Sequence, residues 1–285
     1  MKKLIVLILV WIGALFPTMA HKYALVIGIG NYPDVDYGWC TINGNNDIAI
    51  VQEMLLANGF KSDHIFTLCD ANATYNHILD NLAALTNKLQ QGDRVYIHFS
   101  GHGQQITDLD GDEKDGYDEA WIPYDALQEP TSYYHGEKHL TDDIINKQLH
   151  LMRQKVGAAG SIVVVIDACH SGTATRDISD SSIVRGSTAK FTLSAKPLPF
   201  TQERPIEWIS IVACSDDEVN RQCRVEGNHY GSLSYVLYTL RYQLSNLTVS
   251  ALTAKLAQQV TYPLVARPQT PTVEYSGSNQ QLVFP

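Results

Sequence analysis

The stretch SIVVVIDACHSG at residues 161–172 places a thiol and an imidazole directly after an apolar run. Residues 161–168 are the most strongly apolar of the runs that predict strands, and they are rich in β-branched side chains. This pattern is typical of a strand that is buried on both faces of a parallel sheet. In open parallel sheets, active sites gather at the carboxyl ends of the strands. The stretch therefore indicates both the fold and the position of a site around Cys169.

Four further apolar runs predict strands, at residues 23–29, 64–69, 94–100 and 206–213. Apolar residues at helical spacing predict helices, at residues 47–58, 74–91, 142–156, 232–244 and 249–260. Thr141 is the expected N-cap of the third helix. Strands that alternate with helices predict an α/β fold, with a mostly parallel central sheet sandwiched by helices. The polar, Pro-rich tail after residue 262 contributes at most one edge strand.

The first twenty residues have the pattern of a targeting segment. Lys2 and Lys3 precede an apolar run at 4–16, and Pro17 interrupts it before the small residue Ala20. This predicts a signal peptide over residues 1–20 and a secreted or periplasmic protein. A membrane anchor is the alternative, but the run is shorter than the roughly 20 residues that span a bilayer. We therefore expect no stable membrane anchor, one folded domain over 21–262, and a C-terminal tail over 263–285 that packs on it.

Charge and cysteine count narrow the class of protein further. The formal net charge is −9, and it becomes −11 without Lys2 and Lys3, which disfavours nucleic acid as a partner. Five cysteines are an odd number, so at least one thiol stays unpaired in an oxidising compartment. Cys214 and Cys223 are close enough in sequence for a disulfide, but the sequence leaves open the pairing of Cys40, Cys69, Cys214 and Cys223.

A second strand also ends in residues that carry chemistry. The strand at 94–100 runs into a Gly-His-Gly sequence at 101–103. If this strand neighbours the one before Cys169, His102 serves as acid and base for a Cys169 nucleophile. The amides of Gly103 and Cys169 are then placed to form an oxyanion hole. A buried structural cysteine and a histidine held by a turn are the alternatives, but the joint position at two strand ends favours catalysis.

The segments HFSGHG (98–103) and DACHSG (167–172) resemble the caspase-haemoglobinase clan, and within it the metacaspases and bacterial caspase-like peptidases of family C14. Supporting segments resemble them as well: YALVIGIGNY (23–32), NDIAIVQEML (46–55), DGDEKDGYDEAWIPYD (110–125) and LTDDII (140–145). The resemblance covers most of residues 23 to about 240. It implies a caspase-haemoglobinase fold and a dyad of His102 and Cys169. Their spacing of 67 residues exceeds the roughly 50 residues of caspases. The acidic segment at 108–118, which lies between them, is consistent with an insertion that lengthens this spacing.

The resemblance also implies an acidic S1 pocket, which receives the P1 residue before the scissile bond, built from Asp47, Ser100 and Asp167. Asp167 stands where caspases have glutamine, and a carboxylate there repels acidic P1 residues and pairs with Arg or Lys. The alternatives are a helix N-cap for Asp47 and a carboxylate that orients a turn for Asp167. Metacaspases commonly have Gly-Cys-x-Asn-Asp where this chain has GNND at 44–47, a difference at the edge of the pocket.

The proposed chemistry requires no cofactor, but resemblance to calcium-dependent metacaspases implies four carboxylate ligands, Asp118, Asp142, Asp143 and Asp177. For Asp142 and Asp143 the alternative is a helix N-terminus, whose dipole favours carboxylates. The segment 173–204 carries three basic residues, Arg176, Arg185 and Lys190. A peptidase that cuts after basic residues is expected to process itself there, and an uncut surface loop is the alternative.

Together these features predict a secreted cysteine endopeptidase that acts on peptides or proteins with Arg or Lys at P1. Two alternatives remain open. One is a catalytically silent caspase-homology module that binds partners, against which the presence of both Cys169 and His102 speaks. The other is a peptidase of the same clan with Asp or Asn at P1, against which Asp47 and Asp167 speak.

Overall fold

The computed structural model describes residues 20–33, 35–169, 184–187, 189–194, 206–215, 218–261, 264–265, 269–277 and 281–284. The predicted signal peptide therefore lies outside the described residues except for Ala20, and the predicted ligand Asp177 lies outside them entirely. Within these ranges, no helix has both the length and the apolar character needed to cross a membrane.

A six-stranded sheet forms the centre of the molecule, in the order β11-β8-β7-β3-β1-β2. Its strands are β1 (Lys22–Gly28), β2 (Ile65–Cys69), β3 (Arg94–Ser100), β7 (Ser161–Asp167), β8 (Ile209–Val212) and β11 (Thr272–Tyr275). Neighbours pair in parallel except for β11, which runs antiparallel to β8. The sheet confirms the predicted mostly parallel α/β fold. The apolar runs form its inner strands because helices cover both faces.

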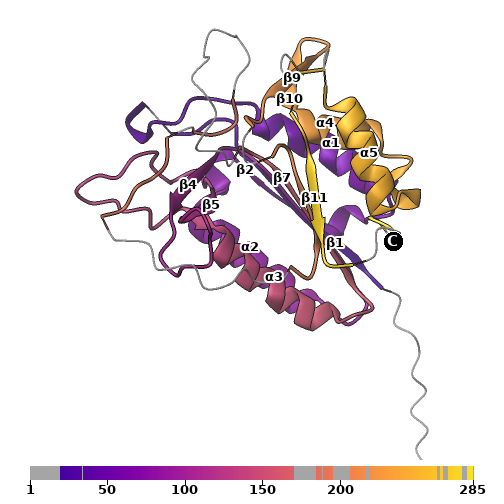
Figure 1. Ribbon diagram of the computed structural model, residues 1–285. Coiled ribbons are helices and arrows are strands. Elements are labelled where there is room, and N and C mark those ends of the chain that lie inside the picture. The colour runs from indigo at the N-terminus through magenta and orange to yellow at the C-terminus, as the bar shows by residue number, and fades with distance from the viewer. Residues whose placement is uncertain are drawn as a thin grey trace, which may run out of the picture.

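Among the described residues, five α-helices flank the sheet (Figure 1): α1 (Gly44–Ala57), α2 (Tyr75–Lys88), α3 (Asp142–Val156), α4 (Ser232–Thr239) and α5 (Val249–Gln259). Helices α2 and α3 lie on one face, and α1, α4 and α5 lie on the other. Each face has its own hydrophobic core. Short 3-10 helices complete the helical segments, at Val35–Tyr37, Ser62–His64, Asp70–Asn72 and Leu244–Asn246.

In the part of the chain that the structure describes, two small sheets lie beyond the carboxyl ends of the parallel strands (Figure 1). One is antiparallel and contains β4 (Gly103–Thr107), β5 (Tyr117–Trp121) and β6 (Leu140–Thr141). The other is the hairpin of β9 (Gln222–Val225) and β10 (Asn228–Gly231). The sequence did not predict these strands, because they are short and lack a clear alternation of apolar and polar residues. They build the walls around the site described below.

The structure corrects several predicted boundaries. Helix α1 begins at Gly44 with Asn43 as its N-cap, so the alternative of Asp47 as the N-cap is wrong. Helix α4 ends at Thr239 and not at 244, and β8 begins at Ile209 and not at 206. Thr141 is the N-cap residue of α3, although its side chain makes no capping hydrogen bond.

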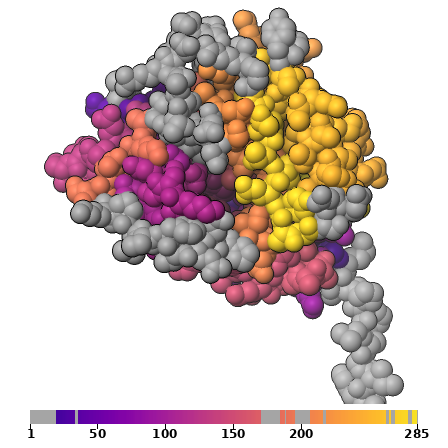
Figure 2. All heavy atoms as spheres, viewed as in Figure 1, coloured from indigo at the N-terminus to yellow at the C-terminus, as the bar shows by residue number. Residues whose placement is uncertain are grey.

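The C-terminal tail contributes to the core. Its strand β11 pairs with β8, and Val283 and Phe284 are buried among residues of α4 and α5. In the space-filling view, the yellow C-terminal segment lies against these helices (Figure 2). The tail therefore adds both a strand to the sheet and apolar side chains to one core.

Candidate active site

Strands β3 and β7 are neighbours, and their last residues, Ser100 and Asp167, stand directly opposite each other. His102 and Cys169 each follow two residues later, so both lie at the same edge of the sheet. Both are buried. The sequence expectation that these two strand ends are adjacent is therefore confirmed.

His102 is held from several sides. Its Nε2 lies 2.8 Å from the carbonyl oxygen of Cys40, and its backbone N–H donates to the Tyr32 hydroxyl over 2.9 Å. The Tyr32 hydroxyl in turn donates to the carbonyl of Ile122 over 3.0 Å. The Trp39 ring stacks on the imidazole with 4.9 Å between centroids. These contacts fix both the position and the plane of the ring.

The contact with Cys40 also fixes the tautomer of His102. A carbonyl oxygen only accepts hydrogen bonds, so Nε2 carries the proton and donates it. The other nitrogen, Nδ1, is then a bare lone pair, and it is buried without a hydrogen-bond partner. Burial lowers the pKa of His102 to about 4, so the ring is neutral near pH 7. The arrangement leaves a proton acceptor available at Nδ1.

The Cys169 thiol lies near two groups that the sequence did not indicate. Its Sγ approaches the carbonyl of Glu218 at 3.8 Å, and Cys214 Sγ approaches the same carbonyl at 3.5 Å. A hydrogen bond to Cys169, together with burial, raises the pKa of Cys214 well above its ordinary value. None of the five cysteines, all of which the structure describes, forms a disulfide, and Cys40 and Cys69 are exposed.

Asp47, Ser100 and Asp167 lie together and are fully buried, a group that we call the acidic pocket; its role in binding P1 stays a prediction. Asp47 is in the first turn of α1 and accepts hydrogen bonds from Ser100 Oγ and from the amide of Gly231. Burial raises the pKa of Asp47, a cation in the pocket lowers it, and the Asp167 carboxylate raises it. Two buried carboxylates side by side make the pocket a site for a cation.

The cation in the pocket is Arg185 of the same chain, and its side chain is completely buried. Its Nη1 donates to Asp47 Oδ2 over 2.8 Å and to Ser100 Oγ, and it lies 3.8 Å from Asp167 Oδ1. Its Nη2 donates to Gln222 Oε1 over 3.3 Å. The pocket therefore matches the size and charge of an arginine side chain.

A series of buried hydrogen bonds holds the Asp167 carboxylate in place. Oδ2 accepts from the hydroxyl of Ser234 over 2.7 Å and from its amide over 2.8 Å. Ser234 Oγ also contacts His98 Nε2 at 3.0 Å, and His98 Nδ1 contacts the Tyr96 hydroxyl at 2.9 Å. The other carboxylate oxygen, Oδ1, accepts from Asn220 over 2.7 Å. These buried partners fix the orientation of the carboxylate.

Gly103 and Cys169 both contact the backbone of Arg185 and Gly186. The Cys169 amide donates to the Arg185 carbonyl over 2.7 Å. Gly103 forms an isolated parallel bridge with Gly186. A Cβ on Gly186 would lie 2.7 Å from both Cys169 Cβ and the Gly103 carbonyl oxygen. Cys169 and Gly103, the residue that follows His102, therefore both lie next to Gly186.

The predicted calcium ligands Asp118 and Asp142 lie in a second cluster of carboxylates, between β5 and the start of α3. Each has a buried carboxylate oxygen without a hydrogen-bond partner. Burial and neighbouring carboxylates, Asp142 first among them, raise the pKa of Asp118 to about 8. They also raise the pKa of Asp142 to about 7. Both shifts show that negative charges crowd one another in this cluster.

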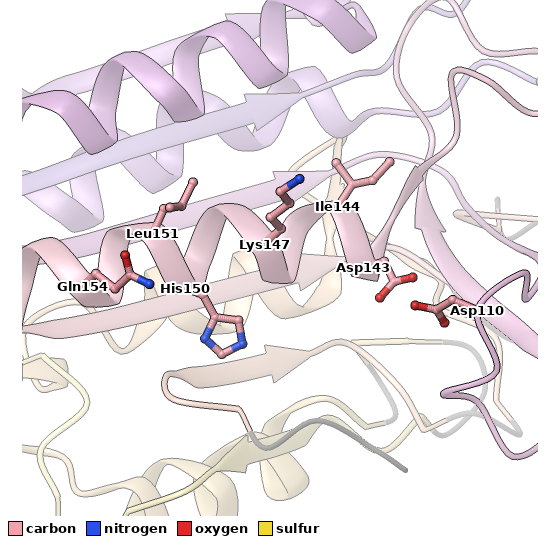
Figure 3. Close-up of a pocket in the computed structure, with 7 residues that line it drawn as sticks. All are labelled: Asp110, Asp143, Ile144, Lys147, His150, Leu151 and Gln154. Atoms are coloured by element: carbon pink, nitrogen blue, oxygen red, sulfur yellow. The ribbon is translucent and has the colours of Figure 1, made fainter. Parts of the chain in front are cut away.

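Carboxylate oxygens of this acidic region come close together in two groups of three residues. Single oxygens of Asp108, Asp112 and Asp118 lie within 4.8 Å of one another, and so do those of Asp110, Asp112 and Asp143. Figure 3 shows Asp110 and Asp143 facing each other at one end of a shallow groove along α3. Asp112 belongs to both groups, and the sequence did not single it out as a ligand.

Several contact residues carried no sequence signal for their role. Cys40 acts through its backbone carbonyl, which any residue supplies. Trp39 and Tyr32 lie in a segment that gave no pattern beyond the resemblance at 23–32. Asn220 and Gln222 belong to the short β9 region, which lacks strand periodicity.

The model of the metacaspase, peptidase C14 domain matches residues 22–177. Metacaspase-1 of Candida albicans is 26% identical over 93% of this chain and 67% of its own length. Metacaspase-1 of Cryptococcus neoformans is 36% identical over 54% of this chain and 32% of its own length. A crystal structure of a Geobacter sulfurreducens protein covers 92% of this chain and 96% of its own, with a TM-score of 0.64 and 19% identity.

The fold and the paired strand ends define a caspase-like protein, which the Geobacter structure supports for the fold alone. Since the family model matches more than half of the chain, the chain belongs to the metacaspase family of peptidase C14. Membership of this family indicates a cysteine-type endopeptidase. The chain spans about two thirds of the Candida relative and about a third of the Cryptococcus relative.

Proposed function

We propose that this chain is a cysteine endopeptidase that cleaves after Arg, and less efficiently after Lys, with Cys169 as nucleophile and His102 as acid and base. The observation that carries the proposal is the buried Arg185 guanidinium between Asp47 and Asp167. An arginine fits there because its planar fork reaches Asp47, Ser100 and Gln222 at once. A lysine ammonium offers the same charge with fewer fixed donors.

The state of His102 supports its part in the chemistry. Nδ1 accepts the thiol proton of Cys169 as the thiolate attacks the substrate carbonyl, and later returns it to the leaving amine. The Cys40 carbonyl takes the place of a third catalytic group, because it holds the ring in the tautomer with Nδ1 free. Water then hydrolyses the thioester and restores the thiol.

Backbone amides supply the charge stabilisation. The Cys169 amide already donates to a carbonyl oxygen in the position that a scissile carbonyl would take. A donor aimed at that oxygen stabilises the negative charge that develops on it during attack. We assign the Gly103 amide as the second donor of this oxyanion hole, on the basis of its bridge to Gly186.

The pocket argues against Asp or Asn at P1. An acidic P1 side chain would enter a buried space that already holds Asp47 and Asp167, and like charges in a buried site are strongly unfavourable. A silent binding module would need neither a positioned thiol nor a neutral imidazole with an unpartnered Nδ1. The site residues therefore favour an active peptidase with a basic P1 preference.

We propose further that the cluster of Asp112, Asp118, Asp142 and Asp143 binds Ca²⁺. The donor set is entirely oxygen, which suits this hard cation, and the unpartnered oxygens of Asp118 and Asp142 remain to be satisfied. Asp177 lies outside the described residues, so its part in the site stays a prediction. Calcium would tie the loop before β5 to α3 by neutralising their mutual repulsion.

Secretion or export to the periplasm is part of the same proposal and rests on the sequence of residues 1–20 alone. Self-processing within residues 173–204 is also part of it and is supported by the basic residues of that segment.

A panel of fluorogenic peptides that differ only in P1 tests the proposal. Wild-type protein without residues 1–20 is expected to hydrolyse Arg peptides fastest, Lys peptides more slowly, and Asp or Asn peptides not measurably. Cys169→Ala should abolish all hydrolysis. Preference for Asp or Asn would overturn the assigned pocket, and hydrolysis that survives Cys169→Ala would overturn the nucleophile.

A further inference from the structure

The peptide segment that fills the candidate site is residues 184–187 of the chain itself. Val184 forms an antiparallel bridge with Arg221, and the Arg185 amide donates to the Asn220 carbonyl over 3.0 Å. An extended peptide bound along a strand edge makes this kind of backbone contact. The segment before the Arg185 carbonyl is therefore bound as a substrate would be.

The contacts continue on the other side of the same carbonyl. The Ser187 amide donates to the Gly103 carbonyl over 3.1 Å, on the far side of Gly186. The close approach of Gly186 to Cys169 leaves no room for a side chain, since an added Cβ would be 2.7 Å from Cys169 Cβ. The bond between Arg185 and Gly186 therefore lies against Cys169, with bound backbone on both sides.

From these contacts we propose that the Arg185–Gly186 peptide bond is the site at which the chain cleaves itself, and that the uncut segment blocks the active site until then. This inference rests on the proposed peptidase function and adds the bond and its regulatory role. The structure contains a single chain, so the contacts are intramolecular. They predict cleavage in cis.

The chemistry of the step is balanced with one water molecule. Cys169 Sγ bonds to the carbonyl carbon of Arg185 and gives its proton to His102. The C–N bond to Gly186 breaks, and the His102 proton goes to the nitrogen of Gly186, which becomes a new amino terminus. Water then hydrolyses the thioester, leaving a carboxylate on Arg185 and the thiol on Cys169.

The two products would stay associated after the cut. Strand β7 belongs to the N-terminal fragment and β8 to the C-terminal fragment, and they pair over four residues from Val163↔Ile209 to Ile166↔Val212. Pocket residues also come from both sides of the cut, since Asp47 precedes it and Gln222 follows it. Cleavage therefore frees the pocket for other substrates without dividing it.

Lys190 provides a matched control within the same segment. It is also basic, but its Nζ lies 3.5 Å from Asp115 Oδ2 and 3.5 Å from the centroid of the Tyr117 ring. Phe191 then continues along β4, with its amide donating to the Gln105 carbonyl over 2.7 Å. These contacts hold Lys190 away from the acidic pocket, so the inference predicts no cleavage after it.

The test follows full-length protein, and protein lacking only residues 1–20, by gel and by sequencing of new amino termini, with and without Ca²⁺. Wild type should yield a fragment that begins at Gly186, with a half-time that does not change over a hundredfold dilution. Cys169→Ala and Arg185→Ala should yield no such fragment. Arg185→Lys should slow the cut by roughly tenfold, and Lys190→Ala should leave it unchanged.

Hydrolysis of an Arg peptide reports the blocking role separately. Wild type should show a lag that ends as the Gly186 terminus appears, whereas Arg185→Ala should be active without a lag. Melting temperatures show whether the Arg185→Ala variant folds. If it does not fold, the lag of Arg185→Lys, which keeps the buried charge, is compared with the lag of wild type instead.

The outcomes separate the two proposals. A first cut after Lys190 or another residue, or a half-time that shortens with concentration, would overturn cleavage in cis at Arg185. Immediate Arg-peptide hydrolysis by uncut wild type would overturn the blocking role while leaving the peptidase assignment intact. Absence of Arg-peptide hydrolysis from every folded variant, with hydrolysis after another residue, would overturn the proposed specificity instead.

Discussion

The backbone amide of Cys169 donates a 2.7 Å hydrogen bond to the carbonyl oxygen of Arg185. This one contact aligns the proposed nucleophile, its oxyanion donor and an internal P1 residue. The Arg185 side chain then reaches Asp47 and Asp167 in the pocket below. Specificity, catalysis and latency are therefore proposed to share the same few residues.

The two pocket carboxylates should control P1 preference. Asp47→Asn or Asp167→Asn removes a buried charge that pairs with the P1 guanidinium, and such charge-assisted contacts contribute several kcal/mol in buried sites. We expect kcat/KM for Arg peptides to fall by roughly 100-fold or more in either variant. Asp80→Asn on the exposed face of α2 is the matched control. Equal kcat/KM in wild type and both pocket variants would contradict the assignment.

Tyr32 should act by positioning His102. Its hydroxyl bridges the His102 amide and the Ile122 carbonyl, and Tyr32→Phe leaves both buried groups unpaired. Each unmet group costs about 1–3 kcal/mol, so we expect a lower melting temperature and a lower kcat with little change in KM for Arg peptides. Tyr133→Phe, at a side chain that is 80% exposed, is the control. A rise in KM alone would point to a substrate contact instead.

Ser234 should orient Asp167 from beneath the pocket. Ser234→Ala removes the hydroxyl between the Asp167 carboxylate and His98, while the Ser234 amide bond to Asp167 stays. We expect a loss of about 1–3 kcal/mol in the free energy of unfolding and a raised KM for Arg peptides. Ser234→Thr keeps the hydroxyl and should recover the KM. If both variants match wild-type KM, the hydrogen-bonded chain has no part in specificity.

The acidic cluster should make stability depend on pH and calcium. Asp118 has its pKa raised to about 8 and Asp142 to about 7, both above their value in an unfolded chain. At any pH between the ordinary carboxyl value of 3.8 and these raised values the folded state binds more protons than the unfolded state, so in chelator stability falls as pH rises from about 4 to about 8. Ca²⁺ needs the deprotonated carboxylates, so its affinity should rise over the same range.

Melting curves and calorimetric titrations with CaCl₂ check this expectation. Ca²⁺ should raise the melting temperature most at pH 8.5, and binding should release protons. Asp118→Asn combined with Asp142→Asn should weaken the pH dependence, to which the raised pKa of Glu113 also contributes, and should remove the calcium effect. An unchanged calcium response in the double variant would exclude these carboxylates as ligands.

Much of the fold was predictable because its strands and helices carry strong patterns. The apolar runs before Ser100 and Asp167 gave β3 and β7 with errors of at most one residue at either end. The adjacency of the two strands was only a condition of the sequence argument, and the pairing of β3 with β7 meets it, which places His102 and Cys169 at one edge of the sheet. The pocket carboxylates followed from the family resemblance, and the structure places them together.

The remainder of the site had no sequence signal. Strands β4, β5, β9 and β10 are polar and short, so neither apolar run nor alternation marked them. Cys40 holds His102 through a backbone atom. Three basic residues lie between 173 and 204, and nothing in their local sequence distinguishes Arg185, whose selection depends on the tertiary contacts of Gly186 with Cys169.

The most direct measurement of the central claim is covalent labelling with peptidyl ketones that differ only in P1, followed by peptide mapping of the modified cysteine. After self-cleavage is complete, an Arg probe should modify Cys169 stoichiometrically, and an Asp probe of the same length should not. The exposed thiols of Cys40 and Cys69 should remain unmodified and serve as internal controls. Labelling of Cys169 by the Asp probe in preference to the Arg probe, or Arg-probe labelling confined to other cysteines, would contradict the account.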